Sequence, residues 1–251
     1  MDKLHTLRAG QGPRLLLLHG IGGSATAWNR QMQRLGKSFC CLAPDLPGYG
    51  DSPAPSGAGL APILEAVADL LDDEPAHVFG VSFGALLALA LAHHYPQRVR
   101  SLVLADATLG RAYLADNERE KWLQGRLALA QSLQKVSVQR AAEIAAPGTP
   151  ASVVEEIAQH MRRARPEGYM AVARTIATTD ARPWLASITK PALVLCGESD
   201  QVTGALVSQT LADSLPHARL HIIPRAGHAP HIEQPDELAQ VVQEFLCGLR
   251  A

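Results

Sequence analysis

The sequence predicts an α/β protein in which helices cover both faces of a mostly parallel β-sheet. Short, wholly apolar runs alternate with segments of helical periodicity along most of the chain. Strands that are apolar on both faces are typical of a parallel sheet buried between helices. Of the 251 residues, 47% are hydrophobic and 19% are charged, which suits one large domain, or one domain with an insertion, around a packed core.

Apolar runs are predicted to form the strands of this sheet, and helical segments follow most of them. The predicted strands are Leu15–Leu18, Phe39–Ala43, Val78–Phe79, Ser101–Ala105, Ala192–Cys196 and Leu220–Ile223. The predicted helices that cover the sheet are Trp28–Leu35, Pro62–Leu71, Phe83–His94 and Pro235–Leu249. The last of these is amphipathic and has proline at its first position, where a helix has no use for the N–H group.

The alternation stops between residues 109 and 186. This part has no strand-like run, and its amphipathic helical segments are Glu118–Lys135, Val138–Ile144, Ser152–Arg163 and Glu167–Thr178. The proline- and glycine-rich stretch Ala146–Pro150 separates two of them. We therefore expect a core formed by residues 1–108 and 187–251, interrupted by a helical cap at 109–186.

Composition excludes several classes of function. The 23 basic residues nearly balance the 24 acidic ones, so nothing predicts a nucleic-acid partner. The N-terminus is polar, and Leu15–Leu18 is too short to span a bilayer, so we expect a cytoplasmic protein without a membrane partner. The four cysteines form neither a disulfide framework nor a metal-binding pair. We expect no metal and no cofactor, and either a monomer or a homodimer.

A single serine lies between two glycines in Gly80-Val81-Ser82-Phe83-Gly84, where a predicted strand meets a predicted helix. In that setting the serine takes a strained backbone position at the turn, and its Oγ projects from the sheet. The free N–H groups at the start of the helix point to the same place. By itself the motif is weak evidence for a nucleophile, because a glycine-rich helix start with a capping serine has the same sequence pattern.

A serine hydroxyl needs a base before it acts as a nucleophile. His228 is the predicted base, because its loop follows the last predicted strand and can reach over the carboxyl end of the sheet. His231, in the same loop, is the nearest alternative. The sequence around His160 indicates a surface residue instead.

The base in turn needs an acid that fixes its tautomer. Asp200 is the predicted acid, because it lies in an acidic turn directly after the buried strand Ala192–Cys196. Glu198 is nearer to the strand and less well placed. Asp106, which follows Ser101–Ala105, is the alternative that can also reach the histidine loop.

Two backbone N–H groups are predicted to form an oxyanion hole. One belongs to Phe83, the residue after the serine. The other belongs to Ile21 in the loop His19-Gly20-Ile21-Gly22-Gly23, which follows the first predicted strand. The alternatives are a plain glycine-rich turn or a phosphate-binding loop, but no lysine follows this loop as a phosphate site requires.

Five motifs in this order resemble the α/β-hydrolase superfamily over essentially the whole chain. They are LLLLHGIGG, DLPGYGDS, GVSFG, GESD and GHAPHIEQP. The resemblance implies an eight-stranded, mostly parallel sheet with a helical cap inserted after the sixth strand. The N-terminus is too short for all eight strands, so the first is expected to be missing. The order of Ser82, Asp200 and His228 is the order of the triad in this fold.

The segments SLVLADAT and PEGYMAVARTIATTDARPWLASITKPALVLCGESD resemble 3-oxoadipate enol-lactonases and related carboxylesterases. This resemblance implies a cofactor-free hydrolase of a small ester or lactone. The alternative is a C–C bond hydrolase with the same triad, but those enzymes tend to have Asn and Trp where this chain has Val81 and Ala229. A further alternative is a ligand receptor on the same fold with little or no turnover.

Four cap residues are candidates for substrate binding. Arg162 belongs to a group of cap arginines, one of which can bind a substrate carboxylate with two hydrogen bonds. Trp122, Tyr169 and Trp184 are candidates for an apolar pocket wall. The alternative for the arginine is a solvated helix face, and for the aromatic residues it is the core of the cap.

Overall fold

The computed structural model describes residues 3–71 and 74–249. Its strands form one sheet in the order β1-β3-β2-β4-β5-β6-β7. Their bounds are Thr6–Ala9 (β1), Arg14–Leu18 (β2), Cys40–Pro44 (β3), Ala76–Val81 (β4), Val99–Ala105 (β5), Ala192–Gly197 (β6) and Ala218–Ile223 (β7). Only β1 is antiparallel to its neighbour in the sheet; the other pairs are parallel. The predicted fold class is confirmed.

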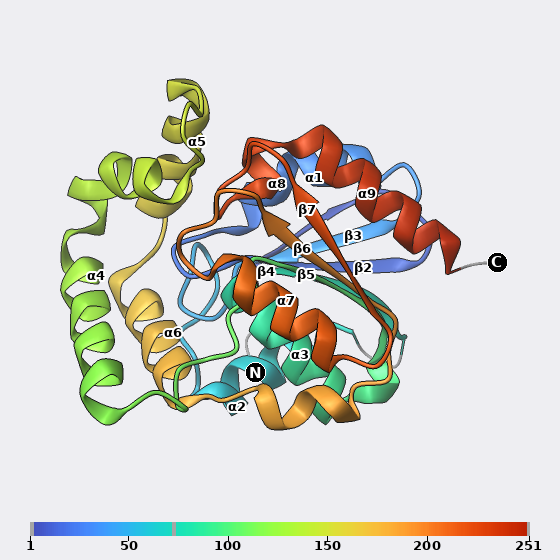
Figure 1. The fold of residues 1–251 in the computed structure, drawn as a ribbon, viewed down its shortest axis with the longest axis horizontal. Coiled ribbons are helices and arrows are strands. Elements are labelled where there is room, and N and C mark those ends of the chain that lie inside the picture. Colours follow the sequence, from blue (N-terminus) through green and yellow to red (C-terminus); the bar gives the residue numbers. More distant parts are fainter. Residues whose placement is uncertain (1–2, 72–73, 250–251) are drawn as a thin grey trace.

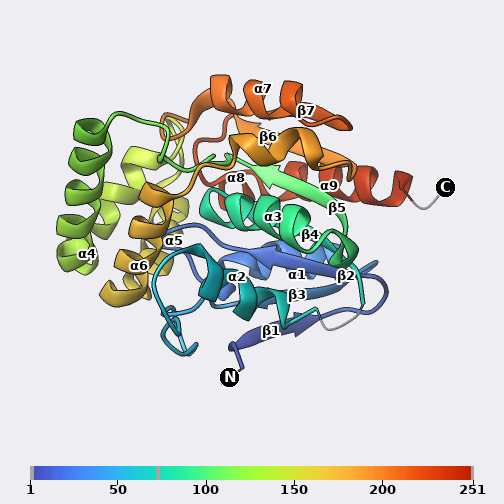
Figure 2. The same cartoon turned by 90° about the horizontal axis from the view of Figure 1, so that it is seen from below.

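Helices cover both faces of the sheet (Figures 1 and 2). One face carries α2 (Leu60–Ala68), α3 (Phe83–His94) and α7 (Gly204–Ser214), and the other carries η1 (Ala25–Trp28), α1 (Asn29–Leu35) and α9 (Pro235–Gly248). The short helices η2 (Pro96–Arg98) and α8 (Pro230–Glu233) lie in connections. In α3 every residue from Phe83 to Ala92 is buried, as expected for a helix that is apolar all round.

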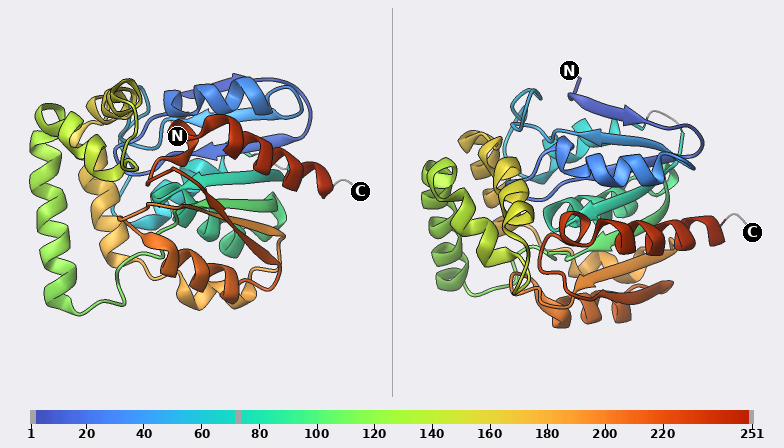
Figure 3. Two further views of the ribbon diagram at one scale, coloured as in Figure 1. Left: turned by 45° about the horizontal axis from the view of Figure 1, so that its top comes forward. Right: turned by 90° about the horizontal axis from the view of Figure 1, so that it is seen from above.

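The cap helices lie between β5 and β6 in the chain and stand together at one end of the sheet (Figure 3). They are α4 (Asp116–Ile144), α5 (Ala151–Arg162) and α6 (Pro166–Thr178), and η3 (Arg182–Ser187) leads back to the core. A bridge between Gly110 and Asp180 joins the two ends of this insertion. We keep the name cap for residues 109–186, and the division from the core stays a prediction. The core ranges include residues 1–2, 72–73 and 250–251, which lie outside the described part.

Three details differ from the expectation. The edge strand β1 was not among the predicted strands. The sheet built by the described residues has seven strands, as expected for the eight-stranded arrangement without its first strand, and the cap that follows β5 then follows the sixth strand of that arrangement. The predicted segments 118–135 and 138–144 form one helix, α4, which bends (Figure 1). The helix α7 was also not predicted. No helix in the described ranges combines the length and the apolar character that a membrane crossing needs.

The topology places the candidate residues at one edge of the sheet. The strand order reverses between β2 and β4, and ligands of such sheets bind beyond the carboxyl ends of the strands at this point. The loop 19–23 follows β2, and Ser82 follows β4. Asp106, Asp200 and His228 follow β5, β6 and β7 in turn. Residues far apart in the chain therefore meet beneath the cap.

Candidate active site

Ser82 forms the turn between β4 and α3. Its backbone angles are φ 55° and ψ −112°, a conformation that L-residues rarely adopt and that is often found at functional sites. A Cβ atom on Gly80 would lie 2.2 Å from the carbonyl group of Gly84, and one on Gly84 would lie 2.0 Å from the oxygen of Leu18. The turn therefore requires glycine on both sides of the serine, as the motif predicts.

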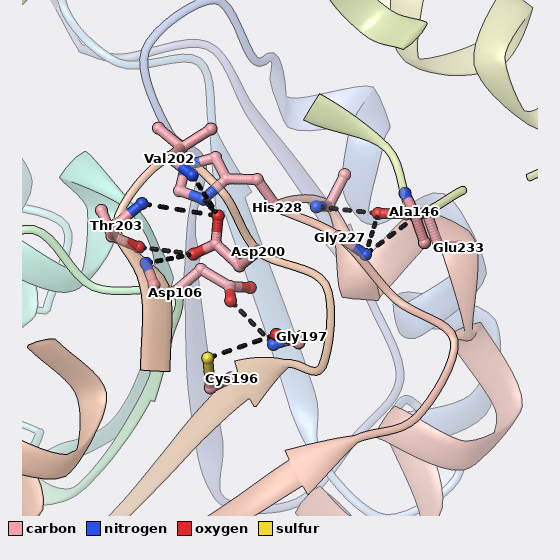
Figure 4. A network of polar contacts seen from close by, with 12 residues as sticks. Asp106, Ala146, Cys196, Gly197, Asp200, Val202, Thr203, Gly227, His228 and Glu233 are labelled. Atoms are coloured by element: carbon pink, nitrogen blue, oxygen red, sulfur yellow. Dashed lines mark hydrogen bonds and ion pairs between the residues drawn. The ribbon is translucent and has the colours of Figure 1, made fainter. Parts of the chain in front are cut away.

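His228 lies in the loop after β7, and its Nδ1 is 3.0 Å from Oδ1 of Asp200 (Figure 4). Because an ionised carboxylate only accepts hydrogen bonds, Nδ1–H donates, and in the neutral imidazole this leaves Nε2 as the acceptor without a proton. His228 and Ser82 line the same cavity. The unprotonated Nε2 is therefore the atom with which His228 can accept a proton there.

Asp200 is a strong hydrogen-bond acceptor. Besides His228, it accepts hydrogen bonds from the N–H of Val202 (2.8 Å), the hydroxyl of Thr203 (2.6 Å) and the N–H of Gly204 (3.1 Å). Burial alone would raise the pKa of Asp200, but the hydrogen bond and charge of His228 and the contacts with Thr203 and Val202 outweigh it and hold the pKa well below its usual range. Asp200 is therefore ionised at neutral pH.

The two other candidate acids have different surroundings. Glu198 is exposed and accepts a hydrogen bond from the N–H of Arg225 at 3.0 Å. Asp106 is fully buried beside Asp200, and its Oδ1 accepts the N–H of Gly197 at 2.8 Å (Figure 4). Of the three acids, Asp200 is the one that is hydrogen-bonded to His228.

The geometry of loop 19–23 is fixed by His19, which is buried. Its Nε2 accepts the backbone N–H of Leu46 at 3.0 Å, so Nδ1 carries the proton and donates to the oxygen of Gly20 at 2.8 Å. That oxygen also accepts the N–H of Gly23. In a trans peptide the N–H points opposite to the carbonyl, so the N–H of Ile21 points away from His19.

Both predicted oxyanion donors are close to Ser82. Ile21 lines the cavity, and a Cβ atom on the neighbouring Gly20 would lie 3.1 Å from Cβ of Ser82. Phe83 is the first residue of α3, so its N–H has no acceptor within the helix, although its side chain belongs to the core. The assignment of these two N–H groups as an oxyanion hole stays a prediction.

The cavity has a volume of about 100 Å³ and lies between the core and the cap. Of the four cap residues predicted to bind substrate, Trp122 and Tyr169 line it, and Arg162 and Trp184 do not. Arg162 is paired with Glu155 and donates to Oγ of Ser137 at 2.9 Å. Trp184 stacks on His93 with ring centroids 5.4 Å apart. Both predictions are corrected, because local partners on the cap and on α3 engage these side chains.

Three arginines that the sequence reasoning missed line the cavity: Arg111, Arg126 and Arg140. The guanidinium carbons of Arg111 and Arg126 lie 4.8 and 5.3 Å from the centroid of the Trp122 ring. Trp122 and Arg126 are one helical turn apart, a spacing from which their contact was predictable. Arg140 is more than three turns further along α4, a separation over which helix periodicity alone does not predict a shared cavity.

Two further histidines, His160 and His231, line the cavity. The sequence indicated a surface position for His160 and left His231 as an alternative base. His160 is half-buried rather than exposed: its Nδ1 lies 3.1 Å from Oγ of Ser24, and burial, assisted by Arg163, lowers its pKa to about 4. His231 packs against Trp28, and burial lowers its pKa to about 3. Both side chains are therefore neutral at physiological pH and form polar but uncharged parts of the wall.

Replacing His231 with phenylalanine is expected to reduce the loss of stability on acidification. An unfolded histidine binds a proton near pH 6.5, whereas folded His231 stays neutral down to about pH 3. The unfolded state therefore binds more protons, and the unfolding free energy of the wild type falls as the pH drops through this window. Between about pH 7.5 and about pH 5 the fall due to His231 is about 2 kcal/mol.

Urea unfolding of both proteins at these two pH values measures the difference. Phenylalanine keeps the aromatic contact with Trp28, so the variant tests the titration and not the loss of a ring. An equal fall in the two proteins would show that His231 does not resist protonation.

Glu233 connects the loop of His228 to the cap (Figure 4). Its carboxylate accepts the N–H groups of Ala146 (2.7 Å), Gly227 (3.0 Å) and Ala229 (3.1 Å), and the hydroxyl of Thr149 (3.1 Å). The N–H of His228 also donates to the oxygen of Ile144 at 2.8 Å. Cap residues 144–149 thus form one wall of the loop that carries His228, and we call these contacts the Glu233 clamp.

The chain is similar in sequence to a known protein family and to several characterised proteins. The family model of the alpha/beta hydrolase fold matches residues 13–235. A pimeloyl-[acyl-carrier protein] methyl ester esterase of Vibrio parahaemolyticus is 30% identical over 254 residues, which cover 96% of this chain and 97% of that protein. A 3-oxoadipate enol-lactonase of Acinetobacter baylyi is 27% identical and covers 93% of this chain, with 88% of its own length covered.

Among solved structures, a thermophilic esterase from Thermogutta terrifontis superimposes with a TM-score of 0.87. It is 27% identical in sequence, and the match covers 99% of this chain and 94% of that one. The sequence had indicated the enol-lactonases; the comparison adds that the methyl ester esterase is somewhat more similar in sequence.

Proposed function

The chain belongs to the α/β-hydrolase fold family, and on this premise we propose that it hydrolyses a carboxylic ester through a covalent acyl-enzyme. Ser82 is the nucleophile, His228 the general base and Asp200 the acid that orients His228. The N–H groups of Ile21 and Phe83 hold the oxyanion. A lactone carbonyl reacts in the same way, with alcohol and acid leaving as one molecule.

The reaction follows from the proton positions in the resting site. Oγ of Ser82 attacks the carbonyl carbon while Nε2 of His228 takes its proton, and the new imidazolium is stabilised by the charge of Asp200. The two N–H groups stabilise the negative charge on the former carbonyl oxygen. His228 then gives its proton to the leaving alcohol. In the second half, His228 takes a proton from water, which attacks the acyl carbon. When the bond from that carbon to Oγ of Ser82 breaks, His228 returns the proton to Oγ, so the acid leaves and the resting site is restored.

A single observation carries this proposal. A strained, nearly buried serine at the end of β4 shares a cavity with a histidine whose other nitrogen is held by a buried carboxylate. The strain at Ser82 has no evident structural purpose other than to present Oγ to that cavity. The esterase and lactonase names of the related proteins support the same chemistry.

The cavity wall favours a substrate with an apolar chain and an anionic end. Its apolar lining includes Leu133, Ile144, Ile157, Met161 and Ile176, all contributed by the cap. Its cationic lining is formed by Arg111, Arg126 and Arg140. Arg140 pairs with Glu143, but in the described part of the chain Arg111 and Arg126 have no carboxylate within salt-bridge distance. We propose that these two guanidiniums face the anionic end of the substrate.

The first experiment compares esters that differ only in that end. Monomethyl esters of linear dicarboxylic acids are assayed beside the dimethyl esters of the same length, with an enol-lactone and a meta-cleavage dienoate for comparison. Faster turnover of the monomethyl esters supports an esterase for anionic substrates. Preferred cleavage of the dienoate would favour the C–C hydrolase, and slow turnover with tight binding would favour a receptor.

The variants Arg111→Gln and Arg126→Gln are each expected to raise KM for a monomethyl ester roughly tenfold, which is the scale of one lost charge-assisted hydrogen bond. KM for the dimethyl ester should change little, because that substrate has no charge to bind. Initial-rate kinetics with both esters measure the effect. Arg162→Gln is the matched control, since Arg162 lies outside the cavity and is paired with Glu155. Equal effects on the two esters would exclude an anion-binding role.

A further inference from the structure

Asp106 lies beside Asp200, and the proposed mechanism gives it no role. It follows β5, is fully buried, and takes the left-handed conformation with φ 45° that residues other than glycine rarely adopt. Its N–H donates to the oxygen of Leu195 at 2.9 Å, and its Oδ1 accepts the N–H of Gly197 at 2.8 Å. These contacts to β6 turn its carboxyl group towards Asp200 (Figure 4).

The second oxygen of Asp106 is unusual. Oδ2 is buried, and no donor contacts it among the residues that the structure describes. A buried carboxylate oxygen without a donor is strongly unfavourable, whereas a protonated oxygen becomes a donor itself and needs only an acceptor. Asp200 offers such an acceptor, since one carboxylate oxygen each of Asp106 and Asp200 and the sulfur of Cys196 lie within 4.8 Å of one another.

Asp200 and Asp106 differ in the number of hydrogen bonds that their carboxyl groups accept. Asp200 accepts hydrogen bonds from four residues, including His228, and has the surroundings of an anion. From the residues that the structure describes, the Asp106 carboxyl group accepts one hydrogen bond. Two carboxyl groups this close do not both ionise, and the group with fewer donors keeps the proton. Burial, followed by the charge of Asp200, raises the pKa of Asp106 well above its usual range.

The other ionisable groups around Asp106 do not change this division. Glu233 on α8 adds a further negative charge, which also favours the protonated form of Asp106. Burial raises the pKa of the Cys196 thiol to about 11, so Cys196 is neutral, and it donates to the oxygen of Gly197 at 3.3 Å. A cluster with one anion and two protonated groups is poorly suited to a metal ion, whose ligands are deprotonated.

We propose that Asp106 is protonated at neutral pH and donates a hydrogen bond to the Asp200 carboxylate, which it thereby positions for His228. The inference rests on the proposed role of Asp200 in ester hydrolysis. Asp106 is a positioning residue, because it acts on His228 only through Asp200. A single proton shared between the two acids keeps one negative charge beside His228, where two would repel each other.

Infrared difference spectroscopy of the purified protein tests where the proton is. At about pH 7 the wild type is expected to show the C=O stretch of a protonated, buried carboxyl group, which the variant Asp106→Asn lacks. Asp45→Asn is the matched control: Asp45 is also buried, but hydrogen bonds from Ala25 and His5 keep it ionised, so this variant should retain the band. In Asp200→Asn the band should titrate at lower pH, because the neighbouring charge is gone.

Kinetics test the positioning role. Asp106→Asn keeps an N–H donor towards Asp200, so its kcat should stay within about threefold of the wild type, whereas Asp106→Ala should lose roughly 10- to 100-fold in kcat at nearly unchanged KM. The proposal is overturned if the wild type lacks the band, if the band ignores Asp200→Asn, or if both Asp106 variants lose activity equally. If Asp200→Asn hydrolyses esters normally while the band is present, the shared proton stands and the proposed function fails.

Discussion

Replacing Ser82 with alanine is expected to lower kcat for ester hydrolysis by about five orders of magnitude, because no other group in the proposed mechanism forms the acyl-enzyme. The protein should remain folded. Alanine keeps the Cβ atom, and the strained backbone at this position is held by the N–H donated to the oxygen of Ala105 at 2.9 Å. Initial rates with a monomethyl ester, together with the melting temperature, measure both parts of the prediction.

A matched control comes from the same region of the molecule. Ser24 also contacts a histidine, His160, so it is a second serine that a base could activate. Ser24→Ala should keep nearly all activity. A fluorophosphonate inhibitor should add its mass to the wild type and to Ser24→Ala, but not to Ser82→Ala. Near-normal rates in a pure preparation of Ser82→Ala would rule out Ser82 as the nucleophile.

Asp200→Asn is expected to lower kcat by about four orders of magnitude while leaving the fold intact. The amide can donate to Nδ1 of His228, which places the ring proton on Nε2, and the base is then unable to accept the proton of Ser82. The measurement is kcat against pH for the variant and the wild type.

The comparison with Asp106→Asn identifies the acid. The sequence left Asp106 as an alternative, and the structure shows the Asp200 carboxylate, not that of Asp106, hydrogen-bonded to His228. A severe loss in Asp106→Asn with a mild loss in Asp200→Asn would reverse the assignment.

The fold was predictable where burial leaves a strong local pattern. Runs such as Leu15–Leu18 are buried on both faces, and their wholly apolar sequence predicts central strands. The strand Thr6–Ala9 was missed because it is a half-exposed edge strand of mixed character, paired on one side only with β3. The helix Gly204–Ser214 was missed for a similar reason, because within it only Ser208 and Leu211 are buried.

In the candidate site, the positions of the triad residues were predictable from the sequence, whereas those of the cap residues were not. Ser82, Asp200 and His228 each follow a buried strand closely, so a parallel sheet brings them together whatever the cap does. The cap residues depend on tertiary geometry. Arg140 lines the cavity although it lies more than three turns beyond Arg126 on α4, and Arg162 is instead paired with Glu155 and Ser137. The histidine letters alone could not show that His160 turns inward to Ser24.

The Glu233 clamp limits how this chain can be recombined with its relatives. A chimaera that exchanges the whole cap also exchanges Ala146 and Thr149, and with them two of the four groups that donate to the Glu233 carboxylate. The graft would alter the loop of His228 even if the new cap packed well. A chimaera can therefore take the substrate preference of another cap only if residues 144–149 of this chain are kept together with its core. The segment to exchange is then the cap without the end of α4 and the connection to α5.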